Sequence, residues 1–155
     1  LRQSTYDLLG RQKTQTDANG NVTSFEYNLL NKISKAVYPG DDTIAQNTIT
    51  YQYDTAGNLA KQQDSLGKVK LFTYDNQNRL LTQIEQKTDG TEAIAVSVKY
   101  DKNGNKRFET DGNGVVTENT FDKLNRVKTL KTAVNQNIQV TTFGYDANGN
   151  QITVK

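Results

Sequence analysis

Apolar and polar residues alternate with a period of two along most of this chain. Between residues 94 and 100 the apolar side chains fall at every second position, and the same holds between residues 49 and 53. Successive side chains of a strand point to opposite faces, so this alternation indicates antiparallel strands with one face buried. These stretches are rich in Thr, Val, Ile and Tyr, which favour strands. Because no segment shows a helical period of 3.6 residues, the pattern predicts an all-β fold.

A pair formed by an aromatic residue and an acidic or amide residue recurs along the chain. The seven pairs are Tyr6-Asp7, Tyr27-Asn28, Tyr53-Asp54, Tyr74-Asp75, Tyr100-Asp101, Phe121-Asp122 and Tyr145-Asp146. Successive aromatic residues are separated by 21, 26, 21, 26, 21 and 24 residues, so a short unit alternates with a longer one. Similarity of a chain to itself at a fixed period predicts a repeat architecture.

Gly or Asn follows three positions after the second residue of every pair. In chain order these residues are Gly10, Asn31, Gly57, Asn78, Gly104, Asn125 and Gly149. Both residue types tolerate a left-handed backbone, and Asp followed three residues later by Gly is typical of a type I turn that the Asp side chain caps. Each pair is therefore predicted to end a strand and begin a tight reversal, with the aromatic ring buried beside it. We expect positive φ at the four glycines and at several of the three asparagines.

The short units contain a second turn of the same kind, and the long units contain a different connection. The second turns lie at 17–20, 64–67 and 111–114, and looser loops are expected at 38–42, 87–90 and 133–136. Seven reversals at the pairs and six between them predict about fourteen strands of roughly 5–8 residues.

The phase of the apolar residues gives two further expectations. Ile33 and Val37 both lie an even number of residues after Tyr27, so all three are predicted to share one face of the sheet. In the last long unit the apolar residues between 138 and 140 fall out of phase with those that follow. This shift predicts a β-bulge between residues 141 and 144.

The repeat spacing also predicts how the chain is organised. Residues 1–155 are expected to form a single repeat array, because the same pattern runs through the whole sequence. Its double units are 6–52, 53–99 and 100–144, and a fourth unit starts at 145–155. The chain begins with Leu and contains no Met, from which we expect a fragment of a larger protein.

Composition excludes several kinds of functional site. Apolar residues make up 34% of the 155 residues, and the 11 glycines raise this to about 41%, compared with about 45–50% in typical soluble domains. The chain has no Cys and no His, which removes disulfides, zinc thiolate sites, thiol nucleophiles and the commonest general base. A net charge of +2 with interspersed signs predicts no nucleic-acid partner. No apolar run approaches the roughly 18 residues of a membrane span.

The pattern Tyr-Asp-x-x-Gly-Arg, which stands as YDLLGR at 6–11, resembles the YD-repeat (Rhs) family. YDNQNRL at 74–80 and FDKLNRV at 121–127 match it with Asn in place of Gly, and DANG at 17–20 matches the second turn. The chain departs from the family pattern at Asn28, at Phe121 and at the asparagines that replace Arg after a turn. These asparagines are Asn58, Asn105 and Asn150.

The resemblance implies a fold of tandem antiparallel β-hairpins that form an open, curved sheet, a segment of an Rhs-type β-shell. In bacterial insecticidal toxin complexes and in Rhs or wall-associated toxins, such a shell encloses a toxic domain. In teneurins a similar shell supports cell adhesion. The resemblance thus implies a structural segment of a secreted or surface bacterial protein rather than an enzyme, packed against neighbouring repeats and associated with an enclosed toxin domain.

No catalytic, cofactor-binding or metal-binding residue is expected. Asp101 to Asn105 and Asp146 to Asn150 place oxygen atoms as a helix-loop-helix calcium site does, but the Gly and Glu needed later in such a loop are missing from the first of them. An acid/base pair of a glycosidase is disfavoured because the acidic residues recur in six pairs. The residues assigned to the structural repeat motif are Tyr6, Asp7, Gly10, Tyr27, Asn31, Tyr53, Asp54, Gly57, Tyr74, Asp75, Asn78, Tyr100, Asp101, Gly104, Phe121, Asp122, Asn125, Tyr145, Asp146 and Gly149.

Two kinds of interaction remain as alternatives. Aromatic faces suit the apolar faces of sugars, so the chain is alternatively a carbohydrate-binding or cell-surface adhesion module, with Tyr51 as the candidate ligand contact. Strands at the edge of an open sheet carry unpaired backbone groups, which predicts edge-to-edge self-association of the isolated chain.

Overall fold

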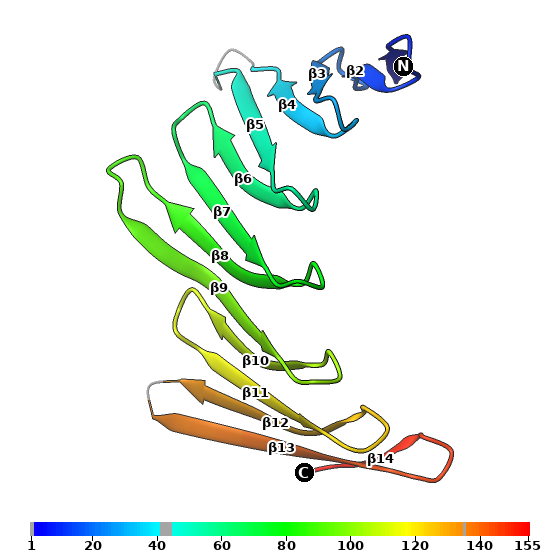
Figure 1. Ribbon diagram of the computed structural model, residues 1–155, viewed down its shortest axis with the longest axis vertical. Helices are drawn as coiled ribbons and strands as arrows, with labels where there is room; N and C mark the ends of the chain where they lie inside the picture. The colour runs from blue at the N-terminus through cyan, green and yellow to red at the C-terminus, as the bar shows by residue number, and fades with distance from the viewer. Residues whose placement is uncertain (1, 41–44, 135) are drawn as a thin grey trace. The chain divides into compact units, whose positions relative to one another are not determined.

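The computed structural model describes residues 2–40, 45–134 and 136–155, and this part of the chain is all-β (Figure 1). The fourteen strands are β1 (Gln3–Tyr6), β2 (Gln12–Thr16), β3 (Val22–Tyr27), β4 (Ile33–Tyr38), β5 (Asn47–Tyr53), β6 (Leu59–Asp64), β7 (Val69–Tyr74), β8 (Leu80–Gln86), β9 (Glu92–Tyr100), β10 (Lys106–Asp111), β11 (Val116–Phe121), β12 (Val127–Val134), β13 (Asn137–Tyr145) and β14 (Gln151–Val154). Among the described residues there is no helix that is long and apolar enough to cross a membrane.

The chain divides into two compact units. The first contains residues 1–72 and 85–92, and the second contains residues 73–84 and 93–155. In the first unit β1 to β7 pair antiparallel in the order of the sequence, and in the second β9 to β14 do the same. Each unit is thus an open sheet of successive hairpins, which confirms the predicted fold of antiparallel hairpin repeats (Figure 1).

All seven aromatic pairs lead into the same turn. In the first, the Gly10 N–H donates to the Asp7 carbonyl at 3.0 Å and the Asp7 N–H donates to the Arg11 carbonyl at 2.9 Å, and the other six repeat both bonds. The residue in the position of Gly10 has positive φ in every case, between 58° at Asn31 and 88° at Gly104 and Gly149. The prediction for the glycines is confirmed, and it extends to all three asparagines.

The loop at 87–90 is not looser than the other turns, contrary to expectation. The Gly90 N–H donates to the Lys87 carbonyl at 3.0 Å, the Lys87 N–H donates to the Thr91 carbonyl at 2.9 Å, and Gly90 has a φ of 83°. This is the same turn with Lys at its first position, and the carboxylate of Asp89 accepts the Thr91 N–H at 2.8 Å. The other two expected loops, 38–42 and 133–136, lie partly outside the described residues.

A β-bulge follows six of the seven pair turns, those after Tyr6, Tyr27, Tyr53, Tyr100, Phe121 and Tyr145, and changes which residues share a face. Opposite Tyr27 lies Ile33, but the next cross-strand pair is Glu26 with Lys35, so Ser34 is an extra residue in β4. The hydrogen bonds of the turn already place Asn31 and Lys32 opposite Asn28, so Ser34 is a second, separate bulge beyond the one that accompanies the left-handed residue.

The bulge makes the prediction for Val37 wrong. Val37 pairs with Ser24, whereas Ala36 pairs with Phe25, which lies on the same face as Tyr27. Ala36 is the residue that this face buries, with 1% of its surface exposed. Counting even intervals from Tyr27 failed because the extra residue in β4 shifts the parity by one.

The predicted bulge between residues 141 and 144 is also wrong. Strand β13 pairs with β12 without interruption from Asn137 to Thr142, and Phe143 and Gly144 pair in regular succession with Val154 and Thr153. The register shift between Gly144 and Tyr145 places the extra residue, Ile152, in β14. Ile138 and Val140 therefore point away from the face of Tyr145, and 57% and 56% of their surfaces are exposed. The backbone keeps its regular hydrogen bonds, and the two apolar side chains stay in solvent.

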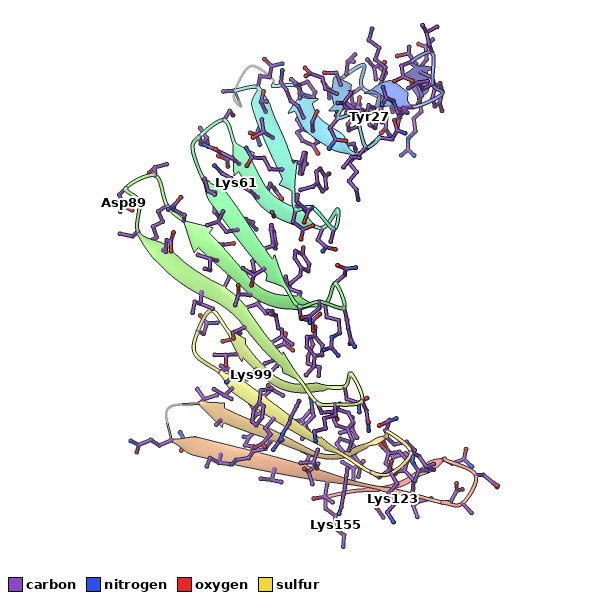
Figure 2. All side chains as sticks on the ribbon, in the orientation of Figure 1. Tyr27, Lys61, Asp89, Lys99, Lys123 and Lys155 are labelled. Atoms are coloured by element: carbon purple, nitrogen blue, oxygen red, sulfur yellow. The ribbon has the colours of Figure 1, made fainter. Side chains whose placement is uncertain are left out.

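Little of the molecule is buried, as the low apolar content suggested. Side chains stand on both faces of the sheet in each unit (Figure 2), and of the described residues only Ala36, Val69 and Val98 are buried hydrophobics. Most strand residues are half-buried. Backbone ladders and contacts along the sheet must therefore supply much of the stability that a closed core supplies in other domains.

The turn geometry predicts the effect of adding one methyl group at Gly57. Gly57→Ala places a side chain at a φ of 86° and against the side chain of Lys32, so we expect a loss of about 1 kcal/mol or more in urea-induced unfolding. Gly112→Ala is the matched control, because its new Cβ meets Ala95 at an ordinary 3.5 Å, and it is expected to unfold like the parent within about 0.5 kcal/mol. Equal midpoints for the two variants would contradict the assignment of the turn.

Candidate functional site

The carboxylate of the pair caps its own turn. One oxygen of Asp7, Oδ1, accepts the backbone N–H groups of Leu9 and Arg11, both at 2.9 Å. Asn28 makes the same two bonds with its amide oxygen, at 2.9 and 3.0 Å. The cap thus requires an oxygen acceptor and not a charge, which explains why the amide is tolerated in the second pair.

The second carboxylate oxygen binds the side chain four residues later. It accepts Nε of Arg11, Arg79 and Arg126, each at 2.7 Å, in three turns. It accepts Nδ2 of Asn58, Asn105 and Asn150 at 2.9–3.1 Å in three others. We call this fourth residue after the acid or amide the lock residue; in chain order the lock residues are Arg11, Lys32, Asn58, Arg79, Asn105, Arg126 and Asn150.

These hydrogen bonds stabilise the ionised form of the capping acids. The pKa of Asp7 is lowered from 3.8, chiefly by the backbone N–H of Arg11, and the pKa of Asp75 is lowered chiefly by the Arg79 side chain. The pKa of Asp101 is lowered chiefly by the Asn105 amide. A lowered pKa suits a structural cap and is the opposite of what a general acid requires at neutral pH.

Four of the seven aromatic rings, those of Tyr27, Tyr53, Tyr100 and Tyr145, pack on the hairpin before them. The Tyr27 hydroxyl donates to the Gln12 carbonyl at 2.8 Å, and the Arg11 guanidinium lies 4.7 Å from the centre of the Tyr27 ring. Tyr53, Tyr100 and Tyr145 repeat both contacts: their hydroxyls donate to carbonyls at 2.8, 3.1 and 2.8 Å, and Lys32, Arg79 and Arg126 lie 5.2, 4.3 and 4.4 Å from the ring centres. The lock residue therefore joins its own turn to the next hairpin.

Phe121 is the one aromatic residue of the seven pairs without a hydroxyl. The hydrogen bond that a tyrosine hydroxyl makes elsewhere is made here by a neighbouring side chain. The carbonyl that corresponds to that of Gln12 belongs here to Lys106, and it accepts Nδ2 of Asn119 at 3.2 Å. The junction keeps a hydrogen bond at this carbonyl although the aromatic residue has changed. Sequence reasoning missed Asn119, and the signal was available as an amide two residues before the only Phe of the pairs.

Gly and Asn in the turns make different contacts with the preceding lock residue. Where the lock residue is Lys32 or Arg79, the next turn has Gly57 or Gly104, and a Cβ there would lie 3.2 Å from the Lys32 Cε or from Nη1 of Arg79. At two of the asparagine turns the Asn side chain instead accepts a hydrogen bond from the preceding lock residue. Asn31 Oδ1 accepts Nη1 of Arg11 at 2.8 Å, and Asn125 Oδ1 accepts Nδ2 of Asn105 at 3.0 Å.

Tyr51, the candidate ligand contact, lies on the aromatic face two residues before Tyr53. It is half-buried, and burial together with a side-chain hydrogen bond to Tyr38 raises its pKa to about 12. It takes part in none of the hydrogen bonds and cation contacts of the junctions described above, and Tyr38 is 37% exposed. No group of three or more His, Cys, Asp or Glu residues that could hold a metal occurs among the described residues.

The fold and these junctions define a β-hairpin repeat protein. The family model for the RHS repeat matches residues 6–43 and 53–92, about half of the chain, and the chain belongs to this family. No curated protein matches the chain.

Solved structures show the same fold. The structure of TcdB2-TccC3 without its hypervariable C-terminal region matches 99% of this chain with a TM-score of 0.80 and 22% identity. The structure of TcdB2-TccC3-Cdc42 matches 97% with a TM-score of 0.78 and 23% identity. This chain covers 9% and 8% of those two chains, so it corresponds to a small part of each.

The junction at Phe121 predicts a compensating pair of substitutions. Asn119→Val leaves the Lys106 carbonyl without its bond and should lower the free energy of unfolding by about 0.5–1.5 kcal/mol. Adding Phe121→Tyr copies the arrangement of Val98 and Tyr100, and we expect it to recover most of this loss. Urea unfolding of the two single variants and the double variant measures the effect. If Phe121→Tyr gives no more stability in the Asn119→Val background than in the parent, the two groups do not share this carbonyl.

Proposed function

We propose that this chain is a structural repeat segment of a secreted or cell-surface bacterial protein, and that its hairpins build part of a β-shell scaffold. The observation that carries this proposal is that the recurring side chains form contacts within and between hairpins. The acids cap turns, the aromatic rings and their hydroxyls bind the preceding hairpin, and the lock residues connect the two. Most of the repeated polar groups are thus occupied by intramolecular contacts, and the proposed role of the segment is architectural rather than catalytic.

The enclosed partner and the location are part of the proposal. Membership of the RHS repeat family and the likeness to TcdB2-TccC3 support a shell that surrounds or displays a further, toxic domain. Those proteins are far longer than this chain, so enclosure would be a property of the whole parent protein, with residues 1–155 contributing one repeat array to its wall. The extracellular or cell-surface location follows from the same family resemblance.

A carbohydrate-binding role is the second candidate, because two tyrosines outside the junctions lie together. Tyr38 and Tyr51 are linked by their side chains on the aromatic face, and Tyr38 is partly exposed. Paired aromatic rings of this kind can stack on sugars. Their mutual hydrogen bond also serves the sheet itself, which is why we favour the scaffold.

Titration of the purified chain with peptidoglycan, heparin and simple glycans separates the two functions. The scaffold predicts no saturable binding by isothermal calorimetry, and no difference between the parent and Tyr51→Ala beyond a loss of stability. Thr50→Ala, on the opposite face of the same strand, is the matched control. Saturable binding that Tyr51→Ala abolishes and Thr50→Ala preserves, with the fold of both variants intact by circular dichroism, would overturn the purely structural proposal.

A further inference from the structure

The hairpins that follow the aromatic pairs fall into two classes that alternate. Glycine hairpins have Gly three positions after the acid, and asparagine hairpins have Asn there. The glycine hairpins contain Gly10, Gly57, Gly104 and Gly149, and the asparagine hairpins contain Asn31, Asn78 and Asn125. Every asparagine hairpin has a long cation as its lock residue, and in chain order these cations are Lys32, Arg79 and Arg126.

A glycine hairpin receives the long cation of the asparagine hairpin before it. The cation lies over the tyrosine ring and beside the glycine, where a side chain would leave it little room. For Arg126 the guanidinium is 4.4 Å from the centre of the Tyr145 ring, and its Nη1 is 3.7 Å from the position of a Cβ on Gly149. The tyrosine hydroxyl donates a hydrogen bond to the carbonyl of the residue that follows the lock residue. Here the Tyr145 hydroxyl donates to the Val127 carbonyl at 2.8 Å.

An asparagine hairpin does not need a cation from its predecessor. Asn125 accepts Nδ2 of both Asn103 and Asn105, at 2.9 and 3.0 Å, so two short amides suffice where the turn itself carries an acceptor. An asparagine turn thus receives either an amide, as at Asn125, or an arginine, as at Asn31, whereas Gly57, Gly104 and Gly149 each lie beside a Lys or Arg. An Asn lock residue fits an Asn turn, and a glycine hairpin takes Lys or Arg.

The first glycine hairpin has the receiving groups of this junction without the cation. Tyr6 is 62% exposed, and a Cβ on Gly10 would meet nothing within 4 Å. Among the described residues no cation lies over the Tyr6 ring, and its hydroxyl makes no bond of the kind that Tyr27, Tyr53, Tyr100 and Tyr145 make. The ring, the hydroxyl and the open space over Gly10 stand together at the edge strand β1.

We propose that this edge is a docking site for one kind of partner, an asparagine hairpin whose lock residue is Arg or Lys. The cation covers the Tyr6 ring above Gly10, the Tyr6 hydroxyl bonds the carbonyl two residues after the partner's Asn, and the partner strand pairs with β1. This inference rests on the proposed function in one respect only, that hairpins of the array pack on one another as neighbours. It adds which hairpin can be the neighbour.

The last hairpin of a second copy does not fit the site. That hairpin is a glycine hairpin whose lock residue, Asn150, is held by Asp146 at 2.9 Å. Placed before Tyr6 it offers no cation to the ring, and Gly10 offers no amide to it. Head-to-tail self-association of the kind expected from the edge strands would therefore lack both side-chain contacts here.

The test adds the missing neighbour to the full chain. A copy of residues 116–139 is fused directly ahead of Leu1, which places the copied Phe121 24 residues before Tyr6, the distance from Phe121 to Tyr145 in the chain itself. Three fusion proteins are compared. The first carries the unchanged copy, the second carries Arg126→Asn in the copy, and the third carries Arg126→Asn in the copy together with Gly10→Asn in the original chain. Amide exchange of the β1 residues is measured by NMR, with exchange in β9 to β11 as the internal control for folding.

The first form is expected to slow exchange in β1 about five- to tenfold relative to the second, because a cation on the ring favours the docked hairpin. The third form should recover the protection, because Asn on both sides recreates the junction of Asn105 with Asn125. Equal protection in all three forms, or no recovery in the third, would overturn the selection between classes and leave the scaffold intact. No protection in any form, with β9 to β11 unchanged, would overturn the packing of neighbouring hairpins and with it the proposed function.

Discussion

The contact of an aromatic ring with the hairpin before it is the interaction on which this structure depends. Few side chains are buried, so a closed core contributes little. Successive hairpins are instead fastened by a cation or an amide from the preceding turn and by a hydroxyl that bonds a preceding carbonyl. Because these contacts join neighbours in the sequence, the stability of the array is expected to be close to a sum of hairpin and junction contributions.

The capping acid makes these junctions possible. Asp75 fixes the turn through the backbone N–H groups of Gln77 and Arg79, and its second oxygen orients the Arg79 guanidinium. The side chain that covers Tyr100 is therefore held in place by its own turn before it meets the next hairpin. A long, flexible side chain loses less conformational entropy on docking when it is already restrained. One residue thus serves the local reversal and the packing between repeats.

Local features of the fold could be predicted from the sequence, and features that depend on register could not. The turns at Gly57 and Asn78 follow from residue chemistry, because few residue types tolerate their backbone. The burial of Ala36 in place of Val37 depends on a bulge that adds one residue to β4, and no residue type marks that addition. The prediction of a looser loop at 87–90 is wrong for a different reason. Lys87 stands where the other turns have an acid or amide, so only Gly90 indicates the tight turn.

The sequence predicts some of the residues in the junctions between hairpins but not their partners. The aromatic residues and acids were found by their spacing, but their partners lie about 20 residues away and on another strand, as Arg11 does from Asn31. The alternation of Gly and Asn was visible as a pattern without a cause. In the structure Gly57 and Gly104 leave room for the preceding Lys or Arg, and Asn31 and Asn125 accept a hydrogen bond from the preceding lock residue. Only the pairing of strands brings these residues into contact.

A double-mutant cycle between Arg79 and Tyr100 measures the central interaction most directly. Arg79→Ala, Tyr100→Leu and the double variant are compared with the parent by urea unfolding. If the ring and the guanidinium hold neighbouring hairpins together, each variant loses unfolding free energy. The sum of the losses in the two single variants should then exceed the loss in the double variant by about 0.5–1 kcal/mol or more. Losses that add to within about 0.3 kcal/mol would show that the two side chains do not stabilise one another, and that the hairpins are joined by their backbone ladders alone.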